Sequence, residues 1–256
     1  MIIMDYYHMD IILYPNKNLQ KSLTKRKCLK QPNIHSIKRL IFPPITETRL
    51  SKIMIDDESI KYITYNSSAQ EITNIIMNNL ENFPCPSHCS EEKWRLKSPD
   101  QRMKKLVITE MTAGVGGNVL NFAKYFKYVN AIELNCIRYK YLNNNIKLYD
   151  YSNVNCYNDN SVSLLIEKDD LGQDIVFFDP PWGGGGYKQF QNLRLDFDKY
   201  SVEVVCQKLL EKNHNKMVIL KLPSNYDFDY FFDQLKSYTI NKFDIEKMTI
   251  IVVKKY

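Results

Sequence analysis

The sequence Asp179-Pro180-Pro181-Trp182-Gly183-Gly184-Gly185-Gly186-Tyr187 follows an apolar run, Ile175–Phe178, that is typical of a buried strand. Two prolines make the turn after this strand stiff, and four glycines let another molecule approach the backbone closely. The indole of Trp182 offers a flat face on which a planar ring can stack. These residues predict a slot for a planar base at the end of a strand, although a tight turn packed by the indole would use the same residue types.

Strand-like and helix-like segments alternate from residue 106 to the end of the chain. Short apolar runs predict strands at residues 106–108, 128–133, 154–157, 175–178, 217–222, 238–243 and 248–253. Helices are expected between them, after Gly117 to about residue 126 and at 136–148, 161–166, 202–210 and 228–235. The alternation predicts an α/β fold with a doubly wound, mostly parallel seven-stranded sheet of Rossmann-like type. The short connection between the last two strands predicts an antiparallel hairpin at one edge.

The residues before this alternation follow a different pattern. A periodic apolar run over Ser67–Leu80 predicts a helix that Ser67 or Ser68 caps, and residues 83–99 are expected to form a polar connection. Four prolines interrupt residues 1–58, which are expected to be short strands or coil. We therefore expect a basic N-terminal extension, 1–58, and one domain, 59–256, that includes its leading helical segment.

Positive charge is concentrated in that extension, and the whole chain has a net charge of +6. Between Asp10 and Glu47 the sequence has no acid and contains the basic residues Lys17, Lys21, Lys25, Arg26, Lys27, Lys30, Lys38 and Arg39. Such a stretch can follow a phosphate backbone, which predicts nucleic acid as the partner. A solvated basic arm is the alternative.

The composition also indicates where the protein works. No apolar run is long enough to span a membrane, and Met1–Tyr14 lacks the basic start and cleavage site of a signal peptide. The six cysteines are scattered without a disulfide framework, which favours a reducing compartment inside a cell. Cys85–Cys89 offers three possible metal ligands but no distant matching pair, so no metal site is expected.

In a doubly wound sheet, ligands bind outside the carboxyl ends of the strands, and polar residues stand at these ends here. The first strand leads into Glu110-Met111-Thr112-Ala113-Gly114-Val115-Gly116-Gly117-Asn118, whose glycines allow a ligand to approach the backbone. Glu133 ends the second strand, where a carboxylate can accept from both hydroxyls of a ribose. Asp159 follows the third strand and could accept from an adenine amino group. A helix cap is the alternative for Asp159, although Asn160 or Ser161 could cap instead.

This order of features resembles that of the class I S-adenosylmethionine-dependent methyltransferases. Within them, Gly-Val-Gly-Gly-Asn at 114–118 and Pro-Pro-Trp-Gly-Gly at 180–184 are similar to the motifs of trimethylguanosine synthases, and the composition also fits viral members. The resemblance covers about residues 63–225 and not residues 1–58. It implies a Rossmann-like methyltransferase fold with S-adenosylmethionine as the cofactor. The cofactor-binding residues that it implies are Glu110, Thr112, Gly114, Gly116, Asn118, Glu133 and Asp159.

The resemblance implies methyl transfer to the exocyclic amine of 7-methylguanosine in an RNA cap. Asp179, Pro180 and Trp182 would be catalytic, and Trp182, Tyr187 and Lys188 would bind the substrate. Two residues depart from the pattern: Asp179 stands where cellular trimethylguanosine synthases commonly have Ser, and Gly185 where they have Pro. Asp-Pro-Pro-Trp is instead the opening of RNA adenine methyltransferases.

Three other functions are therefore compared with cap methylation. The first is an adenine exocyclic-amine methyltransferase on RNA or DNA, which Asp179 favours. The second is a non-catalytic RNA-binding subunit with the same fold, although both motifs look intact. An NAD-dependent dehydrogenase is disfavoured because the first loop lacks a clean G-x-G-x-x-G pattern.

An expected mechanism follows from the chemistry of an aryl amine, whose lone pair is delocalised into the ring. Hydrogen bonds from its N–H groups to the Pro180 carbonyl and the Asp179 carboxylate would favour the attacking geometry, and most of the rate gain would come from positioning. Trp182 would stack on a cationic 7-methylguanine, and Lys188 could meet cap phosphates unless it is a solvated loop lysine. No histidine is required; the histidines lie outside the motifs, at His8, His35, His88 and His214.

Overall fold

The structure is a computed structural model that describes residues 33–87, 89–168, 171–212 and 215–256. Several predictions lie outside these residues. They concern Met1–Tyr14, Cys28, the basic residues between 17 and 30, and three of the four histidines, His8, His88 and His214.

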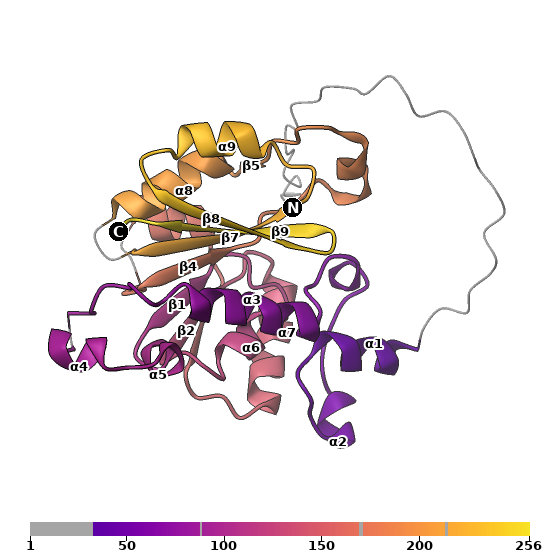
Figure 1. Cartoon of the computed structure of the whole chain (residues 1–256). Coiled ribbons are helices and arrows are strands. Elements are labelled where there is room, and N and C mark those ends of the chain that lie inside the picture. The colour runs from indigo at the N-terminus through magenta and orange to yellow at the C-terminus, as the bar shows by residue number, and fades with distance from the viewer. Residues whose placement is uncertain (1–32, 88, 169–170, 213–214) are drawn as a thin grey trace.

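Within the described residues, seven strands form one sheet in the order β3-β2-β1-β4-β7-β9-β8 (Figure 1). Their bounds are β1 Val107–Glu110, β2 Tyr128–Ile132, β3 Val154–Tyr157, β4 Ile175–Phe178, β7 Met217–Pro223, β8 Thr239–Ile245 and β9 Met248–Lys254. The first five pair in parallel, whereas β9 is antiparallel to both β7 and β8. The predicted α/β fold, with its mostly parallel sheet and antiparallel edge hairpin, is confirmed. Two short strands, β5 (Asp196–Phe197) and β6 (Tyr200–Ser201), form a separate pair.

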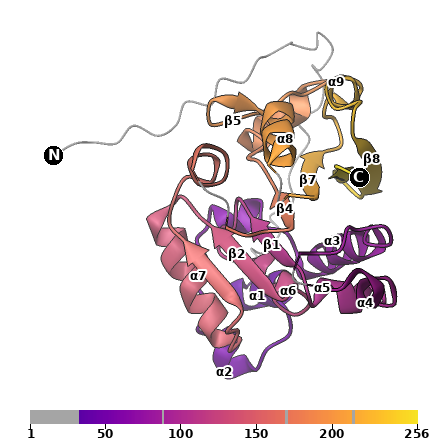
Figure 2. The same cartoon turned by 90° about the vertical axis from the view of Figure 1, so that its left-hand side faces the viewer.

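Helices cover both faces of the sheet (Figures 1 and 2). One face carries α1 (Ile34–Ile41), α3 (Asn66–Asn78), α6 (Val119–Phe122) and α7 (Cys136–Leu148). The other carries α8 (Val202–Glu211), α9 (Phe228–Gln234) and the π-helix η2 (Ser163–Glu167).

The central strand β4 shows why its sequence is a continuous apolar run. Ile175 and Phe177 pack into the core under the first face, and Val176 and Phe178 into the core under the second. Successive side chains of a strand point to opposite faces, and all four are fully buried here. A parallel strand covered on both sides therefore has no polar alternation.

The prediction of strands or coil before residue 58 is wrong for the described part, which contains α1 and α2 (Glu47–Leu50). Asn33 caps α1 because its side chain accepts from the backbone N–H of His35. Ile37 and Ile41, one helical turn apart, then face the core beside Phe42. This short periodicity was obscured by the surrounding prolines and basic residues. The boundary at residue 58 stays a prediction.

Two basic residues of the predicted phosphate-binding stretch are described, and both are engaged within the protein. Lys38 is buried on α1, and burial lowers the pKa of its ammonium. Arg39 donates two hydrogen bonds to Glu47, at 2.7 and 3.2 Å. Contact of the stretch with phosphate would therefore depend on its lysines and arginine before residue 33.

Other predicted elements differ in their ends. α3 begins at Asn66, after Tyr65, and no side chain caps it, so the predicted serine caps are wrong. The polar connection contains α4 (Glu91–Arg95) and leads into α5 (Pro99–Met103). The helix after Gly117 is shorter than predicted, because the chain continues beyond α6 as hydrogen-bonded turns to residue 126. Two 3₁₀-helices, η1 (Ser59–Lys61) and η3 (Gly184–Gln189), complete the described elements.

Candidate active site

Four ionisable side chains lie near the carboxyl ends of neighbouring strands. Glu110 ends β1, Glu133 follows β2, Asp179 follows β4, and Lys221 lies near the end of β7. The sheet order places these four strands side by side, so their ends share one edge of the sheet. This edge brings together three acids that the sequence predicted and one lysine that it did not.

Asp179 and Lys221 form a buried ion pair at this edge. Lys221 Nζ lies 2.6 Å from Asp179 Oδ2, and the two side chains are 6% and 19% exposed. The same ammonium donates to the hydroxyl of Thr64 at 3.0 Å. Burial raises the pKa of the Asp179 carboxyl, and the charge and hydrogen bond of Lys221 oppose that shift. The Asp179 backbone N–H donates to the Thr112 hydroxyl at 3.2 Å, so Thr112 fixes the start of the Pro-Pro turn.

The aromatic residues of the motif pack beside this pair. Trp182 Nε1 donates to the backbone carbonyl of Lys221 at 3.3 Å, and Lys221 Nζ lies 5.3 Å from the centroid of the indole. The rings of Trp182 and Tyr187 meet edge-on, with centroids 5.3 Å apart and an interplanar angle of 77°. Pro180 is buried, whereas Lys188 is exposed, with Nζ 5.7 Å from the Tyr187 ring centroid. The structure therefore brings Asp179, Pro180, Trp182 and Tyr187 together.

The glycine run gives the motif its turn and its open front. Gly183 and Gly184 adopt left-handed backbone conformations, with φ of 83° and 67°. A Cβ added at Gly184, Gly185 or Gly186 would meet no atom within 4 Å, so space is open beside them. The far end is held by Asn225, which follows β7 and donates to the carbonyls of Tyr187 and Phe190, each at 2.8 Å. Both ends of the slot are thus fixed from the end of β7.

Glu110 and Asn118 bracket the first glycine loop. Asn118 Nδ2 donates to Glu110 Oε1 at 3.2 Å, and both side chains are buried. Burial raises the pKa of Glu110 to about 8, so its carboxyl is mostly protonated at pH 7. No described residue bonds to Glu110 Oε2 or Asn118 Oδ1. Buried polar atoms without partners in the protein suit contact with a bound molecule.

The glycines of this loop allow close packing on two sides. Gly116 has φ of 104°, and a Cβ there would lie 3.1 Å from the Leu142 side chain of α7. A Cβ on Gly117 would lie 2.8 Å from Ile63 Cγ1 and 3.1 Å from the Thr64 carbonyl oxygen. The loop is therefore pressed between α7 and the chain that leads into α3.

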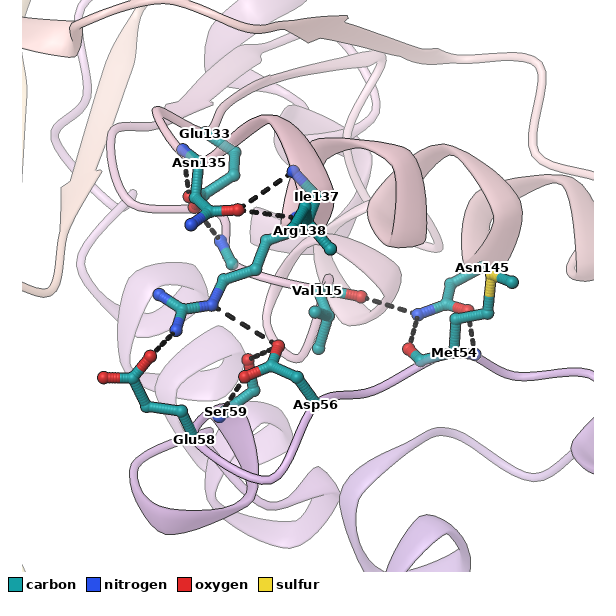
Figure 3. Close-up of polar contacts among 11 residues, drawn as sticks. Met54, Asp56, Glu58, Ser59, Val115, Glu133, Asn135, Ile137, Arg138 and Asn145 are labelled. Atoms are coloured by element: carbon teal, nitrogen blue, oxygen red, sulfur yellow. Dashed lines mark hydrogen bonds and ion pairs between the residues drawn. The ribbon is translucent and has the colours of Figure 1, made fainter. Parts of the chain in front are cut away.

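Glu133 ties this loop to the end of β2. Its Oε1 accepts from the backbone N–H of Asn135 and its Oε2 from that of Gly114, both at 2.8 Å (Figure 3). Burial raises the pKa of the carboxyl, and the two amide donors oppose the shift. Each oxygen keeps a second lone pair, so the carboxylate can still accept from a diol.

Asp159 follows β3 and is partly exposed. Its Oδ1 accepts from the N–H of Asn160 at 2.8 Å, and its Oδ2 lies 3.7 Å from Lys168 Nζ. Asn160 caps the next turn by accepting from the N–H of Ser163 at 3.0 Å, so Asp159 is not needed as the cap. The carboxylate of Asp159 thus remains accessible at the end of β3.

Arg138 on α7 holds the segment before η1 against the site. Its Nε lies 3.4 Å from Asp56 Oδ2, and its Nη2 bonds to Glu58 (Figure 3). Its guanidinium also lies 5.6 Å from the Tyr62 ring centroid. Burial raises the pKa of Asp56, but hydrogen bonds from Ser59 and the charge of Arg138 outweigh it and leave the pKa lowered.

Asn145, two turns further along α7, holds the same segment by its backbone. Its side chain accepts from the N–H of Met54 and donates to the Met54 carbonyl, both at 2.8 Å (Figure 3). It also donates to the carbonyl of Val115 at 2.9 Å. One buried amide therefore joins α7, the glycine loop and residue 54.

Sequence reasoning missed Lys221, Asn225 and the segment from Met54 to Thr64. Lys221 had a signal, because it is a charged residue in the middle of the apolar run at 217–223. Such a lysine can be buried only with a partner, which points to a nearby carboxylate. Asn225 and the residues around Arg138 had no comparable signal, because their contacts depend on chain segments far away in the sequence.

The described residues contain neither a metal-binding cluster nor a membrane-spanning helix. Among them, no group of three or more His, Cys, Asp or Glu side chains is arranged to hold a metal ion. No helix in the described ranges has the length and apolar character to cross a membrane. The five described cysteines are free thiols.

Comparison with known proteins gives a family match and several similar folds. A family model described as RNA cap guanine-N2 methyltransferase matches residues 105–255, more than half of the chain. Among solved structures, a precorrin-6y C5,15-methyltransferase from Geobacter metallireducens is similar, with 15% identity, a TM-score of 0.48, and coverage of 73% of this chain and 89% of that chain. Trm5b from Pyrococcus abyssi has 12% identity and a TM-score of 0.44 over 79% of this chain and 49% of its own. An rRNA methylase from Streptococcus thermophilus has 11% identity and a TM-score of 0.42 over 59% and 87%.

Proposed function

Because the chain belongs to the RNA cap guanine-N2 methyltransferase family, we propose that it methylates the exocyclic amine of 7-methylguanosine in an RNA cap. The chain is an S-adenosylmethionine-dependent methyltransferase with a Rossmann-like fold. The position of Trp182 is the observation that supports 7-methylguanine as the target base. Its indole is half-buried, fixed at Nε1 by Lys221, and adjacent to Asp179 at the end of β4.

The cofactor side of the site is proposed to be the first glycine loop and the end of β2. Glu110 Oε2 and Asn118 Oδ1 are buried polar atoms without partners in the described protein. The protonated Glu110 carboxyl can donate a hydrogen bond from Oε2, and Asn118 Oδ1 can accept one, which fits a polar ligand. Glu133 is already aligned by two amides and has lone pairs left for ribose hydroxyls. Asp159 at the next strand end would accept from the adenine amine. When bound, S-adenosylmethionine supplies an electrophilic methyl group.

Catalysis is proposed to rest on holding the target amine in line. The Asp179 carboxylate and the Pro180 carbonyl would each accept an N–H, which favours the pyramidal nitrogen that attacks. The new N–C bond would form as the S–CH3 bond of the donor breaks, and the nitrogen would then give its extra proton to solvent, so a strong base is not needed. Most of the rate gain would then come from orientation, which effective molarities in well-ordered sites can supply.

Preference for a methylated cap would come from charge. A 7-methylguanine is cationic, and a cation over an indole gains about 0.5–2 kcal/mol, or roughly 2- to 30-fold in affinity. Lys221 is paired with Asp179, so its charge does not oppose a second cation at the indole. Lys188 and Tyr187 would lie on the phosphate side of the base.

Adenine methylation is a second candidate, because the motif opens Asp-Pro-Pro-Trp. Both are tested by incubating the protein with labelled S-adenosylmethionine and one of three acceptors: a 7-methylguanosine cap analogue, an unmethylated cap analogue or an uncapped adenine-containing RNA. Cap methylation predicts label on the methylated analogue and much less on the other two. Label on the adenine RNA alone would replace the proposal with the second candidate, and no transfer to any acceptor would favour a non-catalytic subunit.

A further inference from the structure

We propose that Lys221 is the positioning residue of the base slot, which orients Asp179 and Trp182 together for methyl transfer. The inference rests on the proposed transfer to an exocyclic amine. It adds a role for a residue outside the Asp-Pro-Pro-Trp motif.

Lys221 contacts both residues with different parts of its structure. Its ammonium bonds to Asp179 Oδ2 at 2.6 Å, and its backbone carbonyl accepts from Trp182 Nε1 at 3.3 Å. Because β7 is paired to β4 and β9 on its two sides, this carbonyl belongs to a rigid strand rather than a loop. A single residue therefore fixes the carboxylate and the stacking ring relative to one another.

Burial makes the ion pair obligatory. The Lys221 side chain is 6% exposed, and an ammonium at this depth is strongly unfavourable without a partner. Thr64 supplies a second acceptor at 3.0 Å, so two of the three N–H donors are satisfied within the protein. The Lys221 side chain therefore has few alternative positions, and its ion pair restricts the position of the Asp179 carboxylate.

The pair also controls the charge of the slot. An ionisable group on β1, Glu110, interacts by charge with both Asp179 and Lys221. Burial raises the pKa of Asp179 and Lys221 opposes it, so the carboxylate depends on the lysine to stay ionised. A protonated Asp179 would be a weaker acceptor for the N–H groups of the target amine.

Thr64 extends this control to the segment that leads into α3. That segment lies outside the family match at residues 105–255, yet its end bonds to the catalytic pair. Arg138 and Asn145 hold its beginning on α7 (Figure 3). Residues upstream of the family region are thus connected to Asp179 through Lys221.

The test compares Lys221→Met, Lys221→Arg and a matched control, Lys254→Met. Lys254 is a partly buried lysine on the same sheet, but it pairs with Met217 at the opposite end of β7. For each protein, kcat, KM, the pH profile of kcat, thermal unfolding and cofactor binding by calorimetry are measured, with the acceptor that the wild type methylates best.

For Lys221→Met we expect kcat to fall about 100-fold, as for a misplaced reacting group, while cofactor affinity changes less than about twofold. The acid limb of its pH profile should move to higher pH, because Asp179 loses its neighbouring cation and its pKa rises. Lys221→Arg should recover part of kcat and return the acid limb toward the wild type, and Lys254→Met should match the wild type.

Three results would overturn the inference. One is a Lys221→Met protein with unchanged kcat and an unchanged acid limb. Another is parallel loss of kcat, cofactor affinity and thermal stability that Lys221→Arg does not repair, which indicates a purely structural lysine. The third is a wild type that methylates no base at all, which overturns the proposed function too. A wild type that methylates adenine overturns only the proposed cap substrate, because the Lys221 comparison then proceeds on adenine.

Discussion

Replacing Gly117 by alanine tests the packing of the leading segment on the cofactor loop. An added Cβ would lie 2.8 Å from Ile63 Cγ1 and 3.1 Å from the Thr64 carbonyl, so the segment must move by several tenths of an ångström. Overpacking of this kind is destabilising by about 1–3 kcal/mol. The backbone of Gly117 has no positive φ, so alanine also gains about 0.4–1 kcal/mol by restricting the unfolded chain.

Together the two effects span a net loss of about 0–2.6 kcal/mol in the free energy of unfolding, and their mid-range values give about 1–2 kcal/mol. For a chain of this size that corresponds to a fall of about 2–8 °C in Tm. Because Thr64 also bonds to Lys221, kcat should fall as well, beyond what the small loss of folded protein explains.

The assay is thermal and urea unfolding together with kcat, with Gly185→Ala as the matched control. Gly185 has no positive φ, and a Cβ there meets nothing within 4 Å. The control should keep the wild-type Tm within about 1 °C, since open surface substitutions change stability by at most about 0.5 kcal/mol. If Gly117→Ala unfolds like this control, residues 63 and 64 do not rest on the loop and the reasoning is refuted.

Three further predictions concern single side chains. Trp182→Ala should lower the affinity for a 7-methylguanosine cap analogue and remove the roughly 2- to 30-fold preference over the unmethylated analogue. Calorimetry should find cofactor binding unchanged, and loss of cofactor binding would instead indicate a packing role for the indole. The raised pKa of Glu110 makes the wild type less stable as pH rises from about 4.5 to 8, because the unfolded chain loses this proton more readily than the folded one. Glu110→Gln should therefore gain stability relative to the wild type over that range. A pH-independent difference in urea unfolding would contradict this prediction. Asp56 has a lowered pKa, so its carboxylate stabilises the wild type while it is ionised, and this stability is lost as pH falls below about 4. Asp56→Asn should therefore be less stable than the wild type at neutral pH, and the difference should shrink in acid. Identical acid unfolding of both proteins would contradict this prediction.

The strands were predictable because local composition determines them. Ile175–Phe178 and residues 217–223 are apolar runs that can be buried only between two covered faces, and the structure places both in the middle of the sheet. The polar residues at strand ends could likewise be placed on one edge once the sheet was inferred. Glu110, Glu133 and Asp179 lie there as expected.

The missing parts depend on contacts between distant residues. Lys221 bonds to Thr64 across 157 positions, and Asn145 bonds to Met54 across 91. No local pattern encodes such pairs, so residues 1–58 were expected to be irregular and their contacts with the rest of the chain could not be derived. The helix α1 was missed for a related reason, since its short apolar face is completed only by packing on the core.

The central claim is that Trp182 and Asp179 present a guanine amine to the methyl donor. The most direct measurement is the identity of the methylated atom in one capped RNA that contains a 7-methylguanosine cap and internal adenines. After reaction, the RNA is digested and its nucleosides are separated and identified by mass spectrometry. We predict the new methyl group on the exocyclic nitrogen of the cap guanine. A methyl group on the exocyclic nitrogen of adenine, with the cap unchanged, would contradict the account.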